Sequence, residues 1–231
     1  MHGFTGSGED WGVCFPHLRE SALAIDLPGH GVGSAPVRSF QDSIHDILHA
    51  LPDSVDAVVG YSLGGRFALG LIALDPDRFR RATIISGHPG LQDAFERADR
   101  LAVDRAWIRQ LLDDGIERFV ADWESQPLFA TQARLPTAIL ERQRRRRLSH
   151  RTAGLAASLE QHGLARMPSL WEPLAAFPGQ VSWIVGAADS RFLGIAREVV
   201  RRRPATRLHV LPGVGHNPLL ECPEILAGLL V

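Results

Sequence analysis

The segment that decides the fold is Gly60-Tyr61-Ser62-Leu63-Gly64, which lies between two apolar runs. Residues 56–59 have the apolar character of a strand, and residues 65–74 have that of a helix. A serine in the sharp reversal between strand and helix adopts a strained conformation, and small residues on both sides of it make room for the turn. This pattern predicts a nucleophile elbow. The Ser62 hydroxyl would stand above the sheet, and the Leu63 backbone N–H at the helix N-terminus could stabilise an oxyanion.

Short apolar runs alternate with helical patterns along most of the 231 residues. Strands are expected at residues 22–26, 56–60, 82–86, 181–186 and 206–211, and helices at residues 40–51, 65–74, 192–203 and 223–230. This alternation predicts an α/β fold with a mostly parallel sheet flanked by helices.

Between residues 92 and 174 the strand signal disappears, and charged, helix-favouring sequence takes its place. We interpret this segment as a helical cap inserted into the core, whose two parts are then residues 1–91 and 175–231. Ligands of open α/β sheets bind at the carboxyl ends of the strands. A cap at that edge would cover the site and contribute contacts to the substrate.

Composition and charge exclude several classes of protein. The net charge is −1, so neither nucleic acid nor a membrane surface is expected as a partner. All 25 cationic residues are arginine, which excludes a lysine Schiff base and a P-loop lysine. Cys14 and Cys222 lie at no metal or redox spacing and are expected to be reduced, structural thiols. No histidine and carboxylate cluster has the spacing of metal ligands, so no metal or other cofactor is expected.

The sequence says less about the cellular location and the partners of the chain. No apolar run reaches the length of a membrane span, and no basic region followed by an apolar stretch begins the sequence, so a cytoplasmic location is expected. The arginine run at residues 144–147 lies on an expected helix, where consecutive residues face different directions. Most of that run is therefore expected to be solvated. The sequence leaves the oligomeric state open.

A serine at an elbow needs a base, and the base needs an orienting acid. Asp189 follows the strand expected at residues 181–186, and His216 follows the last expected strand in a glycine-rich loop, where Asp189 could fix its tautomer. The chain order of serine, aspartate and histidine is that of α/β hydrolases. Near the start of the chain, His2-Gly3-Phe4 would supply a second oxyanion donor from the Phe4 backbone N–H. His30 is expected to fix its own loop by hydrogen bonds.

Several longer segments narrow the family further. Loops at residues 2–6, 26–31 and 213–217 fit many α/β hydrolases. More specific are GYSLGGR at residues 60–66, GHPGLQ at 87–92, ERA at 96–98 followed by Arg100, Asp104, Arg105 and Trp107, and ADW at 121–123 ahead of Gln126 and Pro127. With these segments the chain resembles, over nearly its whole length, the 2-succinyl-6-hydroxy-2,4-cyclohexadiene-1-carboxylate synthases, which are menaquinone-biosynthesis enzymes of the α/β-hydrolase fold.

The resemblance implies a lyase rather than a hydrolase. Such an enzyme eliminates pyruvate from 2-succinyl-5-enolpyruvyl-6-hydroxy-3-cyclohexene-1-carboxylate, a small tricarboxylate, and consumes no water. Ser62, relayed through His216, would be the base that removes a ring proton next to the succinyl ketone. The Phe4 and Leu63 N–H groups would stabilise the enolate-like oxygen, and its collapse would expel pyruvate without an acyl-enzyme.

A tricarboxylate needs cations in its pocket. Arginine suits this task because its planar fork pairs with a carboxylate and keeps its charge when partly desolvated. Arg66 lies one helical turn past the elbow, near the expected mouth of the site. The family pattern implies Arg100 and Arg147 as the other two carboxylate ligands, and Tyr61 and Trp123 as walls of the pocket.

The chain departs from the family pattern at two places. Glu124 stands where the family has an aromatic residue. An acid facing the pocket would oppose a carboxylate-rich ligand, so we expect either that Glu124 faces solvent or that the substrate differs. The chain begins at Met1-His2-Gly3, where the family has a further strand beside the elbow strand. Without that strand, backbone groups of its neighbours would lack partners, so the natural protein is expected to begin upstream.

Two other functions stay open on the sequence. An ester or thioester hydrolase would use the same triad, although a neutral ester has no need of Arg66, Arg100 and Arg147 together. A non-catalytic ligand-binding protein of this fold would not need an intact triad.

Overall fold

A single parallel sheet positions the rest of the described chain. In the computed structural model, which describes residues 1–18, 21–31 and 36–230, four strands run parallel in the order β1-β2-β3-β4. They are β1 (Ala57–Tyr61), β2 (Arg81–Ile85), β3 (Gln180–Gly186) and β4 (Arg207–Leu211). Tyr61 lies beside Ile85, and Ile85 beside Ile184, so the carboxyl ends of neighbouring strands meet at one edge of the sheet.

Helices make up most of the remaining regular structure. The α-helices are α1 (Phe40–Ala50), α2 (Leu63–Leu74), α3 (Ala94–Asp113), α4 (Gly115–Glu124), α5 (Thr137–Leu148), α6 (Thr152–His162), α7 (Trp171–Ala176), α8 (Ser190–Arg202), α9 (Pro218–Glu221) and α10 (Pro223–Leu229). The 3₁₀ helices are η1 (Gly8–Val13), η2 (Phe15–His17) and η3 (Pro127–Arg134). None of the described helices is both long and apolar enough to cross a membrane.

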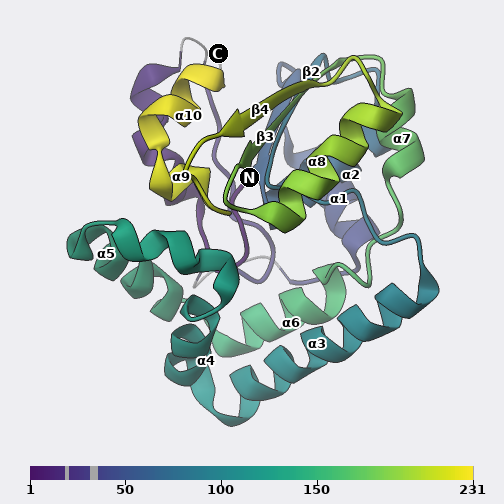
Figure 1. The fold of residues 1–231 in the computed structure, drawn as a ribbon. Coiled ribbons are helices and arrows are strands. Elements are labelled where there is room, and N and C mark those ends of the chain that lie inside the picture. The colour runs from purple at the N-terminus through teal and green to yellow at the C-terminus, as the bar shows by residue number, and fades with distance from the viewer. Residues whose placement is uncertain (19–20, 32–35, 231) are drawn as a thin grey trace.

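Helices cover both faces of the sheet, because its strands carry apolar side chains on both sides (Figure 1). Val58, Ile84 and Trp183 face the larger core, where side chains of α1, α2, α7 and α8 pack. Tyr61 and Ile184 face a second core with side chains of η1, α9 and α10. The loops that leave the carboxyl ends of the strands are thereby held between two packed layers.

Helices α3 to α6 form a separate layer below the sheet-bearing part in Figure 1. This layer has a small core of its own, which includes Leu111, Phe119 and Leu155. The absence of strands predicted for residues 92–174 is confirmed in the described chain. The chain is already back against the larger core at α7, because Leu174 belongs to that core and α7 packs against α2.

The predicted elements are confirmed within two residues, with one exception. Residues 22–26, expected to be a strand, pair with no described strand. A groove of about 260 Å³ is lined both by this segment and by β1, and no described backbone hydrogen bond joins the two. Without a paired neighbour, the segment cannot form ladder hydrogen bonds. Met1 does pair with β1: its amino group donates to Val59 O (2.8 Å) and its carbonyl accepts from the Tyr61 N–H (3.1 Å).

The cysteines are free thiols, as expected. Cys14 is buried and Cys222 is half-buried. Burial raises the pKa of both thiols, that of Cys222 to about 11 with Glu221 adding to the effect. A high pKa keeps a thiol protonated and poorly nucleophilic, which fits a packing role for both residues.

Candidate active site

The elbow has the strained geometry that its sequence predicts. Ser62 stands between β1 and α2 with φ 51° and ψ −106°, a conformation that residues other than glycine rarely adopt. A Cβ at position 60 would lie 2.1 Å from the Gly64 carbonyl oxygen, and a Cβ at position 64 would lie 2.3 Å from the Met1 carbonyl oxygen. The Ser62 N–H donates to Ile85 O at 2.8 Å, which ties the turn to β2. Both glycines are therefore required by close backbone approach.

The three residues predicted as a triad are joined by hydrogen bonds. His216 Nδ1 lies 2.7 Å from Asp189 Oδ2, and His216 Nε2 lies 3.1 Å from Ser62 Oγ. Asp189 also caps α8, because its Oδ1 accepts from the Phe192 N–H (3.2 Å). The carboxylate and the imidazole are both buried. An imidazole that donates from Nδ1 to a carboxylate keeps Nε2 free to accept the serine proton.

The two predicted oxyanion donors lie at the same cavity as Ser62. Leu63 is the first residue of α2, and neither its N–H nor that of Phe4 bonds to any described group. Both amides are thus available to a ligand oxygen. The N-terminus of α2 adds the favourable end of the helix dipole.

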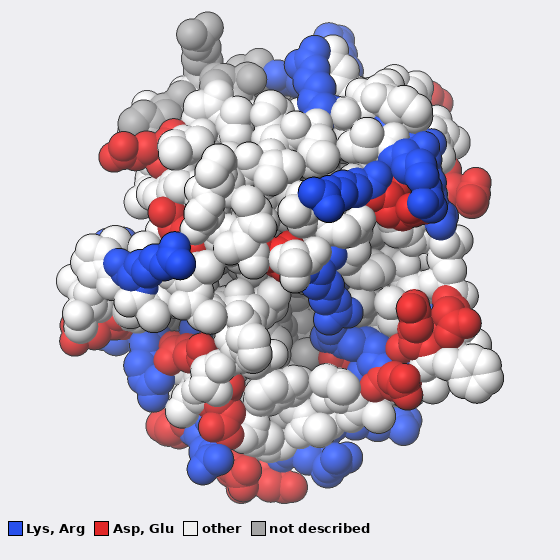
Figure 2. Space-filling view, viewed as in Figure 1, with Lys and Arg blue, Asp and Glu red and all other residues white. Residues whose placement is uncertain are grey.

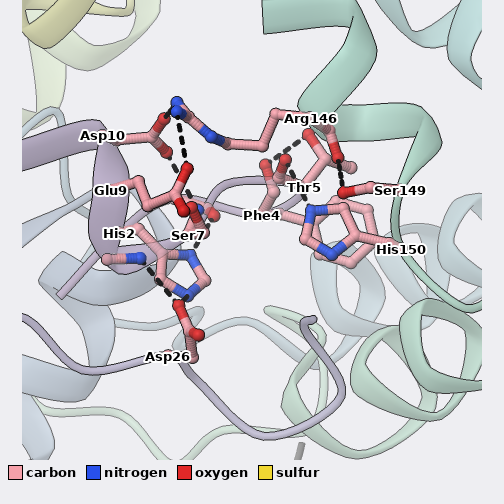
Figure 3. Close-up of polar contacts among 12 residues, drawn as sticks. His2, Phe4, Thr5, Ser7, Glu9, Asp10, Asp26, Arg146, Ser149 and His150 are labelled. Carbon is pink, nitrogen blue, oxygen red and sulfur yellow. Dashed lines mark hydrogen bonds and ion pairs between the residues drawn. The ribbon is translucent and has the colours of Figure 1, made fainter. Parts of the chain in front are cut away.

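Buried histidines hold the loop that carries Phe4 (Figure 3). The Leu27 N–H donates to His2 Nε2 (2.9 Å), and the Gly31 N–H donates to His150 Nδ1 (2.9 Å), so His150 Nε2 carries the proton that it donates to Thr5 O (3.0 Å). Burial lowers the pKa of His2 to about 3 and also lowers that of His150. These rings therefore act as neutral hydrogen-bonding groups.

His30 has the loop-fixing contacts expected of it. Its Nδ1 lies 3.3 Å from Pro28 O, and its ring packs edge-on against His2 (4.8 Å between ring centres), Phe4 (5.4 Å) and His150 (5.5 Å). It does not line the cavity at Ser62.

A cavity of about 270 Å³ opens above the elbow, between the strand ends and the helical layer. Figure 2 shows a hollow in this region with arginine side chains along one side. Four of the residues expected to contact the substrate line it: Tyr61, Trp123, Arg66 and Arg100. Among the described residues that line it there is no aspartate or glutamate. The cavity is therefore suited to an anionic ligand.

Two of the predicted arginines lie in this cavity, and each has a protein partner. Arg66 donates from Nη1 to the His162 carbonyl oxygen (2.6 Å). Burial, with the nearby charge of Arg100, lowers the pKa of Arg66 to about 9. Arg100 donates from both Nε and Nη2 to Asp104 Oδ1 (2.8 Å each), and Asp104 is buried. Asp104 thus orients Arg100 and offsets part of its charge.

Arg147 lies elsewhere. It lines an adjoining cavity of about 250 Å³ and not the one at Ser62. Its guanidinium carbon lies 5.3 Å from the ring centre of Phe129, and Nη1 donates to Glu124 Oε1 (3.0 Å). The Arg147 side chain is only 5% exposed. Glu124 also accepts from Arg144 (2.5 Å), so this half-buried acid is directed at the arginines of α5 and does not line the Ser62 cavity.

The arginine run on α5 is less solvated than expected. Arg145 is 71% exposed, whereas Arg146 bonds to Asp10 in η1, just after the loop that carries Phe4 (Figure 3), and Arg147 faces inward. The helix lies against η1 through these ion pairs, so only part of each turn can face water.

Sequence reasoning missed several residues that line the Ser62 cavity, among them two that can donate hydrogen bonds. His88 follows the carboxyl end of β2, and Arg191 follows Asp189 in the first turn of α8. Their place just after strand ends was the available signal, because that edge collects binding residues in parallel sheets. Among the described residues no group of three or more histidine, cysteine and acidic side chains is arranged to hold a metal.

Comparisons with known proteins agree with this architecture. Residues 1–229 match the family model described as "Alpha/beta hydrolase family". A Bacillus subtilis (strain 168) protein named "Putative 2-succinyl-6-hydroxy-2,4-cyclohexadiene-1-carboxylate synthase" is 35% identical over 100% of this chain and 87% of its own length. The Escherichia coli (strain K12) protein that carries the same name without "putative" is also 35% identical, over 99% of this chain and 90% of its own.

Solved structures give the same picture. The structure described as MenH from S. aureus superimposes with a TM-score of 0.92 and 27% identity, covering 100% of this chain and 90% of that one. A thermophilic esterase from Thermogutta terrifontis superimposes with a TM-score of 0.83 at 20% identity, covering 99% of this chain and 85% of that one, and shows likeness of fold.

Proposed function

We propose that this chain, which belongs to the alpha/beta hydrolase family and within it to the 2-succinyl-6-hydroxy-2,4-cyclohexadiene-1-carboxylate synthases, eliminates pyruvate from 2-succinyl-5-enolpyruvyl-6-hydroxy-3-cyclohexene-1-carboxylate. The chain is an enzyme of menaquinone biosynthesis. One observation carries the proposed reaction: Ser62, His216 and Asp189 form a hydrogen-bonded chain at a cavity lined by arginines and by no described acid.

Proton abstraction is the first step of the proposed reaction. Ser62 Oγ lies 3.1 Å from His216 Nε2, so the hydroxyl proton can pass to the imidazole as the serine oxygen takes the ring proton next to the succinyl ketone. Asp189 holds His216 in the required tautomer and stabilises the imidazolium. The strained backbone of Ser62 holds the oxygen in place and leaves less reorganisation for the reaction itself.

Electrostatic stabilisation and bond cleavage follow. Loss of the ring proton moves negative charge onto the ketone oxygen. The free N–H groups of Phe4 and Leu63 stabilise this charge by donating hydrogen bonds to that oxygen. The electrons then form a ring double bond at the deprotonated carbon, the existing ring double bond moves by one position toward the ether carbon, and the ether carbon–oxygen bond breaks. The departing enolate takes up the proton held on His216 and becomes pyruvate. No water enters the balance, and Ser62 forms no covalent intermediate.

The helical segment at residues 92–174 acts in this proposal as the cap of the site. It supplies Arg100 and Trp123 to the cavity. Arg146 of α5 contacts η1, and His150, just after α5, contacts the loop that carries Phe4. A layer with a core of its own can close over a bound substrate and exclude water. A cytoplasmic location stays a prediction.

The test is release of pyruvate from the enolpyruvyl substrate by wild type and by Ser62→Ala. Loss of the catalytic base should lower kcat by at least about 100-fold. Ser54→Ala, an exposed serine away from the cavity, is the matched control and should leave the rate unchanged. Hydrolysis of a simple aryl ester without any pyruvate release would instead assign a hydrolase. Failure of Ser62 to react with a serine-directed phosphonate, together with no turnover, would leave a binding protein.

A further inference from the structure

The proposed substrate carries three carboxylates, but the cavity at Ser62 holds two of the three arginines that the family pattern implies. Arg147 is committed to Glu124 and stacked on Phe129, outside that cavity. Arg100 is partly neutralised by Asp104. A third carboxylate therefore needs donors from elsewhere in the cavity wall.

Arg191 is a free cation at the required place. It lies in the first turn of α8, two residues after Asp189, and its exposed side chain lines the cavity. No described residue forms a hydrogen bond or ion pair with it. Near the other end of the same helix, Arg201 and Arg202 are both paired with Glu198. Arg191 thus presents its full charge to whatever enters the cavity.

His88 supplies a neutral donor to the same cavity. The Gly90 N–H donates to His88 Nδ1 (2.9 Å), so Nδ1 must be unprotonated and the ring proton sits on Nε2. Nε2 bonds to no described group, and the side chain lines the cavity. Burial, with the charges of Arg66, Arg191 and Arg100, lowers the pKa of His88 to about 3. Its Nε2–H is therefore a fixed donor that does not titrate near neutral pH.

We propose that His88 and Arg191 form a third carboxylate subsite in the cavity at Ser62. A carboxylate is an acceptor with two oxygens, and the subsite offers only donors: a guanidinium fork and one imidazole N–H. The carboxyl ends of β2 and β3, which are neighbours in the sheet, bring the two residues to one edge. The identity of the substrate in this inference rests on the proposed function, whereas the subsite itself is argued from the residues of the cavity alone.

Binding of propane-1,2,3-tricarboxylate, followed by calorimetry, tests the subsite without turnover. Arg191→Gln and His88→Leu should each raise its Kd by about tenfold, and Arg191→Lys should recover part of the loss. Arg197→Gln is the matched control, because Arg197 is exposed on the same helix and does not line the cavity. Near-ultraviolet circular dichroism confirms that each variant is folded.

Pyruvate release provides the second readout. In the same variants KM for the enolpyruvyl substrate should rise by about tenfold, while kcat changes by less than about threefold. An Arg191→Gln protein that binds the tricarboxylate as tightly as Arg197→Gln overturns the subsite. Normal tricarboxylate binding by wild type without pyruvate release would contradict the proposed reaction alone, and the effects of Arg191→Gln and His88→Leu on that binding would still decide the subsite.

Discussion

Replacing Glu124 with glutamine should destabilise the protein, because it leaves Arg147 buried without an anionic partner. The Arg147 side chain is 5% exposed and that of Glu124 is 25% exposed, so the pair lies between the surface and the buried limits. Removing one partner of a buried pair costs about 3–5 kcal/mol, and exposed pairs contribute about 0–1 kcal/mol. We therefore expect Glu124→Gln to lower the free energy of unfolding by about 2 kcal/mol, or Tm by about 4–8 °C for a chain of this size.

Urea unfolding followed by the fluorescence of the five tryptophans measures this change. Arg147→Met should restore part of the loss in the Glu124→Gln background, since methionine can pack on Phe129 without a charge. Arg145→Gln removes an arginine that is 71% exposed on the same helix and should change stability by less than about 0.5 kcal/mol. The reasoning is refuted if Glu124→Gln is as stable as wild type while Arg147→Met raises KM strongly, because Arg147 would then be a substrate ligand.

Two further predictions concern the elbow and the loop that carries Phe4. Gly60→Ala should cost about 3 kcal/mol of stability or prevent folding, because its Cβ would lie 2.1 Å from a backbone carbonyl oxygen. Gly194→Ala, where nothing lies within 4 Å of the added Cβ, should instead gain about 0.5–1 kcal/mol; equal Tm values for the two variants would contradict this account. His2 has a pKa near 3 in the folded protein and about 6.5 in the unfolded chain. At a pH below 6.5, unfolding is therefore accompanied by protonation of His2. The contribution of His2 to the free energy of unfolding should therefore be fully present above pH 6.5. It should fall as the pH is lowered toward 3, by up to about 1.4 kcal/mol per pH unit. His2→Asn should flatten this slope in urea titrations at successive pH values, and an unchanged slope would rule out His2 as its source.

The elbow and the order of the triad could be predicted from sequence because their signals are local. The glycines at positions 60 and 64, an apolar strand before them and a helix after them lie within about twenty residues, and a strand-to-helix reversal leaves few conformations open. Asp189 and His216 could be placed for a related reason. Parallel strands bring their carboxyl ends to one edge, so a residue just after a strand is near the others whatever the loops between them do.

The strand expected at residues 22–26 shows where such reasoning stops. Its apolar pattern indicates a strand, but a strand exists only beside a partner, and no described backbone hydrogen bond joins this segment to β1. Pairing joins residues far apart in the chain and is not encoded in the pattern of one segment alone.

The choice of arginines for the cavity shows the same limit. Helical periodicity tells which residues of α5 share a face. Which face points inward is decided by two tertiary contacts of α5, one with η1 through Arg146 and one with Glu124 through Arg147. Arg147 consequently pairs with an acid, while Arg191, which the family pattern does not imply, lines the cavity. Local patterns thus determine the elbow and most of the strands and helices, because neighbours in the chain impose them, and the common edge of parallel strands adds the triad. The tertiary structure alone decides which charges remain unpaired at the site, because each charge is offset by a partner that is distant in sequence.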